Sequence, residues 1–298
     1  MTAARRIEFA KACFLHACRL DVAVRKPGNV SGVSPGHGMD AQRFIASAQA
    51  AVAPLFEAGA RVGPRIEAAM VASLAAAGCN TNLGIVLLCA PIAAAVERVA
   101  LPAGAQELRT AIVAVLADLD VADAQAAYRA IALANPGGLG HAPAQDVRAA
   151  PGIDLRAAMA LAAARDNIAA QYANGYAELF ELALPSLRSG YTPMRVNAAL
   201  AADPRTAERV QRVYLLLLGS LADSHIVRKH GEAVAHTVMR SAQGWWGRAI
   251  PENDEEFAAW DESLKARGIN PGTSADLTVA AVLLDALLAP EPAAWHET

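Results

Sequence analysis

The chain has 298 residues, a formal net charge of −3 and a hydrophobic share of 54%. This charge balance lacks the basic footprint of a nucleic-acid-binding protein, so we expect no nucleic-acid partner. The hydrophobic excess comes from alanine, the strongest helix former, while aromatic residues supply only 5%. The length allows one large domain with a sizeable core.

The apolar segments and the cysteines exclude two further classes of protein. The longest apolar run, 85–96, is shorter than the roughly 20 residues that a membrane-spanning helix needs. The first 20 residues mix charges among apolar positions at helical spacing, which predicts a helix and not a signal peptide. The four cysteines form no C-x-x-C pair, which is typical of reduced thiols. We therefore expect a cytoplasmic protein with no membrane contact.

Apolar periodicity predicts helices along the whole chain and no strand, because β-branched residues are scattered and do not alternate with polar ones. In the first half the predicted helices cover 4–24, 41–58, 64–78, 80–96, 104–118 and a segment that begins after Asp120. In the second half they cover 155–182, 205–221, 230–246, 253–267 and 273–288. We expect a single all-α domain of about ten helices over residues 1–298.

The stretch 77–96 is the one around which the chain is organised. Gly78 predicts a helix end, because glycine accepts the left-handed conformation of a C-terminal cap. Asn80 or Thr81 then offers an oxygen to the free N–H groups of a helix that is almost wholly apolar. The positive end of a buried helix dipole is suited to binding an anion, although an ordinary capped core helix would have the same pattern.

Two loops in the first half carry polar groups beside flexible backbone. Lys26 and Gly28 lie in a Lys-Pro-Gly-Asn segment, where a cation and an accessible backbone could contact phosphate, or simply form a surface turn. His37 stands between two glycines before Asp40, which is a suitable helix N-cap. A long loop over 135–154 contains Asp146, and loops of that length inside a compact domain are often functional.

The densest polar cluster is 223–231, directly after an apolar run. It contains Asp223, Arg228, Lys229 and His230, so one segment offers both a carboxylate and phosphate contacts, although a charged helix end is often just solvated. Asp276 lies in the first turn of the last apolar helix, where the helix dipole alone would account for it. Neither a P-loop nor a dinucleotide-binding glycine motif occurs. Together, carboxylates and cations near helix starts favour a Mg²⁺-triphosphate site.

Several of these motifs, in this order, resemble the triphosphoribosyl-dephospho-CoA synthase family. They are KPGNVS, a Met-Asp helix entry, Asn80-Thr81 before a buried helix, DSHIVRKHG and NPGTSADL, which span most of the chain. The resemblance implies an all-helical transferase that uses ATP as ribosyl donor. The 2′-hydroxyl of dephospho-CoA would attack C1′ of ATP, adenine would leave, and the triphosphate would stay on the transferred sugar.

The resemblance and the residue pattern give a set of candidate site residues. Asp223, Asp146 and Asp40 are candidate catalytic carboxylates. Asp40, Asp146, Asp223 and Asp276 are candidate Mg²⁺ ligands. The candidates for binding the nucleotide are Lys26, Gly28, Asn80, Thr81, Arg228, Lys229 and His230. The sequence does not indicate which carboxylate acts as the base.

One departure from the family pattern affects the expected substrate. Relatives of the citrate lyase branch have Asn-Thr-His-basic-Gly where this chain has Asn82 and Leu83 in the third and fourth positions. The acceptor is therefore dephospho-CoA or a related alcohol. Two alternatives stay open: an ATP-dependent transferase acting on a pterin- or furan-type one-carbon cofactor precursor, and a non-catalytic helical nucleotide-binding protein. Alanine-rich helices with apolar faces make a homodimer a further expectation.

Overall fold

The computed structural model describes residues 1–136, 145–190, 194, 196, 203–250 and 254–289. Within these ranges all regular structure is helical, apart from two isolated bridges in the loop before Asp40, so the predicted all-α class is confirmed. The first half contains α1 (Ala3–Ala23), α2 (Ala41–Leu55), α3 (Val62–Ala77), α4 (Leu83–Val96), α5 (Ala105–Ala117) and α6 (Val121–Ala134). The second half contains α7 (Leu155–Ala162), α8 (Asn167–Asn174), the π-helical segment η1 (Leu179–Ala183), α9 (Leu184–Arg188), α10 (Pro204–Ser220), α11 (Ser224–His230), α12 (Glu232–Gln243), α13 (Glu255–Ala266) and α14 (Gly272–Leu287).

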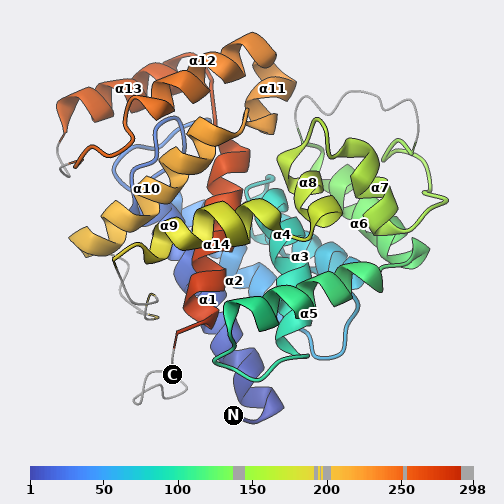
Figure 1. Cartoon of the computed structure of the whole chain (residues 1–298). Coiled ribbons are helices and arrows are strands. Elements are labelled where there is room, and N and C mark those ends of the chain that lie inside the picture. The colour runs from blue at the N-terminus through green and yellow to red at the C-terminus, as the bar shows by residue number, and fades with distance from the viewer. Residues whose placement is uncertain (137–144, 191–193, 195, 197–202, 251–253, 290–298) are drawn as a thin grey trace.

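The most buried helices are α4 and α14, which pack against each other inside a layer formed by the other helices (Figure 1). Pro91 lies inside α4 and has no N–H, so it leaves the Leu87 carbonyl without its helical donor. The Tyr172 hydroxyl donates to that carbonyl at 2.6 Å, and the Tyr176 hydroxyl donates to the Leu88 carbonyl at 2.7 Å. The segment after α7 is thereby fixed against α4.

The predicted single helix over 155–182 is wrong, and the structure shows why. Asp166 accepts hydrogen bonds from the N–H groups of Ile168 and Ala169, so it caps a new helix, α8. Gly175 then ends α8 with a left-handed φ of 68°. The polar cluster 223–231 likewise forms its own helix, α11, which ends at Gly231 with φ of 84°. Such breaks raise the number of helices in the described residues above the expected ten.

Two hydrophobic clusters hold the helices together in the described residues. The larger is centred on α1, α4 and α14, and the smaller joins α10 to α13 through Tyr214, Trp245 and Phe257. The Tyr214 hydroxyl donates to the Pro27 carbonyl at 2.7 Å and so fixes the loop after α1 against α10. No helix in the described residues combines the length and apolar character that crossing a membrane requires.

Candidate active site

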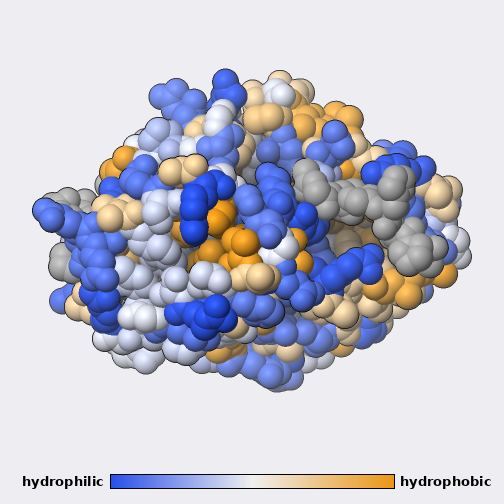
Figure 2. Space-filling model, turned by 90° about the horizontal axis from the view of Figure 1, so that it is seen from above, coloured by the Kyte–Doolittle hydropathy of each residue, from blue (hydrophilic) through white to orange (hydrophobic). Residues whose placement is uncertain are grey.

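The N-terminal ends of four helices, α4, α8, α11 and α14, meet at a cavity of about 570 Å³. The C-terminal part of α6, helix α7 and the loop before α2 complete its wall. In the view from above, apolar residues gather in a hollow near the middle of the surface, within a border of hydrophilic residues (Figure 2). Side chains cap N–H groups at all four starts, but each start keeps the partial positive charge of its helix dipole, so this arrangement favours an anionic ligand.

Asp276 is the fifth residue of α14, just beyond the first turn in which the sequence predicted it, and lines the cavity against Gly84 of α4. A Cβ at position 84 would overlap the Asp276 carboxyl oxygen, so the glycine is what lets the two helix starts approach. Burial and the nearby Asp21 and Asp223 raise the pKa of Asp276 well above 3.8, and Arg228 only partly offsets them. The cavity therefore contains a carboxyl group that holds its proton far more tightly than an ordinary aspartate.

His225 lines the cavity from the first turn of α11. A Cβ on Gly272 would come within 2.9 Å of its Nδ1, so the ring lies against the glycine that begins α14. Asp276 is four residues further along α14, which places it one helical turn from this contact. Burial and the cations Lys229 and Arg228 lower the pKa of His225 to about 3, so the ring is neutral. Its buried Nε2 has no hydrogen-bond partner among the described residues.

The cationic side of the cavity comes from α11 and the segment before α8. Arg228 donates to Asp166 at 2.7 Å, and both residues line the cavity with Lys229 and Arg165. A second contact joins the two helix starts, because the Asn167 N–H donates to the Ser224 hydroxyl at 2.9 Å. The guanidinium is thus held in place by a carboxylate that is itself fixed as a helix cap.

Asp223 has a different environment from the one predicted for a catalytic or metal-binding carboxylate. Its side chain is fully buried and is not part of the cavity wall. It accepts from the His225 and Ile226 N–H groups, and its second oxygen accepts from the Ser274 N–H at 2.7 Å and hydroxyl at 2.8 Å. These four bonds occupy the carboxylate, so we revise its role: Asp223 joins the starts of α11 and α14 and thereby positions the cavity wall.

Lys26 and Gly28 also lie behind the wall. Lys26 is fully buried and forms an ion pair with Asp21 at 3.1 Å. The Gly28 N–H donates to Asp261 at 2.8 Å, and its left-handed φ of 81° brings the loop against residues 269–271. The neighbouring Asn29 does line the cavity, with its amide donating to Asn270 at 3.0 Å. The Pro27-Gly28 and Pro271-Gly272 segments are therefore in contact. The side chains that they place in the cavity wall are Asn29 and Asn270, whereas the sequence predicted that Lys26 would bind the nucleotide.

Asn80 and Thr81 line the cavity, as their position before α4 led us to expect. The Asn80 oxygen accepts from the Leu83 N–H at 3.2 Å and so satisfies the first N–H of α4, whose N-cap residue is Asn82. Thr81 donates to Ser47 at 2.6 Å. Asn82 is buried and accepts from Ser73 at 2.6 Å. Leu83 makes this part of the wall apolar.

The remaining predicted residues are placed as follows. Asp40 caps α2, accepts from the Arg43 N–H at 2.9 Å and is exposed outside the cavity wall. His230 also lies outside the wall, with Nε2 donating to the Gly268 carbonyl at 3.0 Å. Asp146 lines the cavity and forms an ion pair with Arg148 at 3.6 Å, whereas 137–144 of its loop lie outside the described residues. The four carboxylates predicted to bind Mg²⁺ are therefore not gathered, and no other metal-binding group of His, Cys, Asp or Glu occurs in the described part of the chain.

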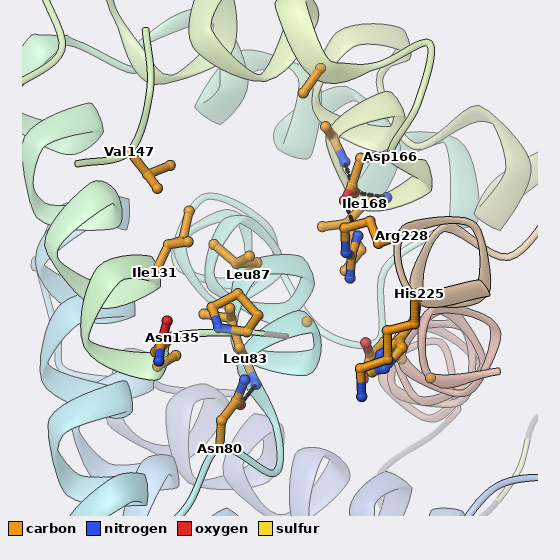
Figure 3. A pocket seen from close by; sticks show the side chains of 18 of the residues that line it. Asn80, Leu83, Leu87, Ile131, Asn135, Val147, Asp166, Ile168, His225 and Arg228 are labelled. Carbon is orange, nitrogen blue, oxygen red and sulfur yellow. Dashed lines mark hydrogen bonds and ion pairs between the residues drawn. The ribbon is translucent and has the colours of Figure 1, made fainter. Parts of the chain in front are cut away.

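Sequence reasoning missed several lining residues. His225 and Asn29 were inside motifs already singled out, and Asp166 was visible as part of a polar triplet within an alanine-rich stretch. The apolar wall had no local signal, because its residues come from four helices and a loop that meet only in the fold. Its members are Leu83, Leu87, Ile131, Val147, Met159 and Ile168. In Figure 3, Leu83, Leu87, Ile131 and Val147 lie across the cavity from Arg228 and His225.

An all-helical protein whose helix starts surround a carboxyl, an imidazole and a guanidinium group is suited to group transfer from an anionic donor. The comparisons identify the class. The model of the CitG family, described as ATP:dephospho-CoA triphosphoribosyl transferase, matches residues 7–293. The chain therefore belongs to the CitG family, and the resemblance inferred from its motifs is confirmed.

The structural comparison agrees on the fold. A crystal structure described as a candidate triphosphoribosyl-dephospho-CoA synthase from Archaeoglobus fulgidus has a TM-score of 0.63 and 22% identity. The similarity covers 82% of this chain and 99% of the other, and at this identity it shows a shared fold alone. Comparison with curated proteins yields no match. By its family the chain is a transferase with ATP as substrate and dephospho-CoA, or a related alcohol, as acceptor.

Proposed function

We propose that the cavity is where the transfer takes place, with Asp276 and His225 beside the reacting carbon of ATP. The observation that carries the proposal is the position of Asp276. It belongs to the NPGTSADL motif, lies at the meeting point of α4 and α14, and has a raised pKa in a cavity whose opposite side is cationic. A protonated carboxyl beside a leaving base is the group that transfer from a nucleoside requires.

In the proposed step, the acceptor hydroxyl forms a bond to C1′ as the bond from C1′ to the adenine nitrogen breaks. Asp276 gives its proton to a ring nitrogen of the departing adenine, and the carboxylate that results stabilises positive charge at C1′. The neutral ring of His225 takes the proton from the attacking hydroxyl. Proton transfer from His225 back to Asp276 restores both groups, so the step leaves no net charge on the protein.

The triphosphate would lie against Arg228, Lys229 and Arg165, near the starts of α8 and α11. In the proposed complex Asn80 and Thr81 hold ribose or phosphate oxygens at the start of α4. Mg²⁺ would enter as part of the ATP substrate and take most of its ligands from phosphate oxygens and water, since Mg²⁺ needs few protein carboxylates. Of the predicted metal ligands, Asp146 and Asp276 line the cavity. Because Asp276 is assigned here as the acid, Asp146 is the one left to contact the ion.

Two expectations from composition stay proposals. The four cysteines are free, three of them buried, which agrees with reduced thiols and a cytoplasmic location. The second expectation is a homodimer, which apolar helix faces favour. Gel filtration coupled to light scattering tests it.

The test is to incubate the protein with ATP, Mg²⁺ and dephospho-CoA and to quantify free adenine and ADP. We expect adenine to form only when the acceptor is present. Asp276→Asn keeps the shape of the side chain but removes the acid, so adenine release should fall at least about a hundredfold. The matched control is Asp203→Asn, which changes an exposed helix cap outside the cavity. ADP as the main product would contradict the proposal, and adenine formed only with another alcohol would identify a different acceptor.

A further inference from the structure

The apolar wall consists of Leu83, Leu87, Ile131, Val147, Met159 and Ile168, and the proposed chemistry leaves it unexplained. Most of these side chains are at most 9% exposed even though they line an open cavity, so they form part of the core that the cavity reaches. Sugar, phosphate and hydroxyl groups would lose hydrogen bonds to water against such a surface. A flat, uncharged ring is the kind of group that this surface binds.

The wall adjoins the reacting group directly. Gly84, which contacts Asp276, follows Leu83 in the first turn of α4, and a Cβ at position 84 would lie 2.8 Å from Ile168 Cδ1. Asp276 thus lies at the edge of the apolar wall. Arg228 also lines the cavity and partly offsets the raised pKa of Asp276, and Figure 3 shows it across the cavity from Leu87 and Ile131. A ligand with a ring at one end and phosphates at the other would span the cavity with its sugar beside Asp276.

We infer that the apolar wall is the binding subsite for the purine base of the donor, and that it holds this base while the bond to C1′ breaks. The inference rests on the proposed function, in which ATP is the donor and Asp276 protonates the base. Leu83 gives the wall an uncharged surface at the start of α4. The three phosphates are accordingly left to Arg228, Lys229 and Arg165.

The experiment measures the binding of the base and of the phosphates separately, and it does not depend on catalysis. Free adenine and inorganic tripolyphosphate are titrated by calorimetry into the wild type, Leu83→Lys, Ile131→Asn and Arg228→Gln. Replacing an apolar contact by a group that must be desolvated should weaken adenine binding about tenfold or more in the two wall variants. Tripolyphosphate binding should be unchanged in Ile131→Asn and weakened in Arg228→Gln, whereas Arg228→Gln should bind adenine as the wild type does.

Leu133→Asn is the matched control for Ile131→Asn, because Leu133 is on the same helix, is 53% exposed and lies outside the cavity wall. It should bind adenine normally, and equal helicity of all variants confirms folding. The inference is overturned if adenine does not bind the wild type, or if the wall variants bind it unchanged. It is also overturned if those variants raise KM for dephospho-CoA and leave KM for ATP unchanged, since the wall would then belong to the acceptor. Adenine binding without adenine release would instead count against the proposed reaction alone.

Discussion

Two glycines determine how the side chains proposed to react are placed. Gly84 lets Asp276 approach the first turn of α4, and Gly272 leaves room for the ring of His225. Neither glycine has a left-handed backbone, so neither is needed for backbone conformation. The absent side chains leave the space that the Asp276 carboxyl and the His225 imidazole occupy. The functional requirement at these positions is therefore steric.

This view predicts the effect of Gly84→Ala. The added Cβ would overlap the Asp276 carboxyl oxygen, so Asp276 must move away from its place in the cavity. Alanine is favoured over glycine in a helix by about 1 kcal/mol, so the fold should persist. We expect adenine release to fall at least about tenfold while the circular dichroism spectrum is retained.

The control is Gly104→Ala, where a Cβ meets no atom within 4 Å and φ is −70°. This variant should keep full activity. Full activity in Gly84→Ala as well would show that the position of Asp276 is not critical.

The raised pKa of Asp276 and the lowered pKa of His225 predict a one-sided pH profile. Asp276 acts in its protonated form and its pKa is raised, so kcat is full below that pKa and falls as pH rises through it. His225 acts in its neutral form, and with a pKa lowered to about 3 it stays neutral throughout the range from pH 5 upward. A profile of kcat against pH should therefore show an alkaline limb and no limb near pH 6.5.

NMR of ¹⁵N-labelled histidine checks the second half of this prediction, since the His225 signals should not titrate above pH 5. Facing His225 are the cations Lys229 and Arg228 with His37 and His230, all of which disfavour its protonated form. A His225 titration centred near pH 6.5 would show that burial and the nearby cations do not lower the pKa of this ring. It would contradict the role proposed for His225 as the base.

At the scale of elements, Asp223 joins two helix starts that are distant in sequence. It caps the seven-residue helix α11 and binds Ser274 in the first turn of α14. A helix this short is not stable by itself, so its position depends on such contacts. The sequence predicted a catalytic or metal-binding carboxylate at this position, whereas burial and four hydrogen bonds suit Asp223 to positioning the two helix starts.

Asp223→Ala should accordingly lower the free energy of unfolding by about 3 kcal/mol, from a lost cap and unsatisfied buried N–H groups. Asp254→Ala provides the comparison, because Asp254 caps α13 through one hydrogen bond, from the Phe257 N–H, and should cost about 1 kcal/mol. Urea denaturation measures both. An equal decrease in the free energy of unfolding of the two variants would show that the hydrogen bonds to Ser274 do not contribute to stability.

Over the whole molecule, the sequence predicted the fold class and many helix boundaries, because caps act locally. Asp40 and Asp120 mark helix starts, and Gly78 marks a helix end. It failed over 155–182, where alanine periodicity continued through the cap at Asp166. It placed Asn80, Thr81, Asp146, Arg228, Lys229 and Asp276 correctly at one cavity. It could not distinguish these from Lys26 and Asp223, since burial behind the wall depends on contacts between distant segments.

We propose that this cavity releases adenine from ATP by transfer of the triphosphoribosyl group, with Asp276 as the acid. The most direct measurement quantifies adenine, ADP and the coupled product by chromatography and mass spectrometry, for the wild type and for Asp276→Asn, with ATP, Mg²⁺ and dephospho-CoA. The account predicts one adenine per molecule of coupled product from the wild type, and almost none from Asp276→Asn at unchanged thermal stability. Equal adenine release by the two proteins, or ADP in place of adenine, would contradict it.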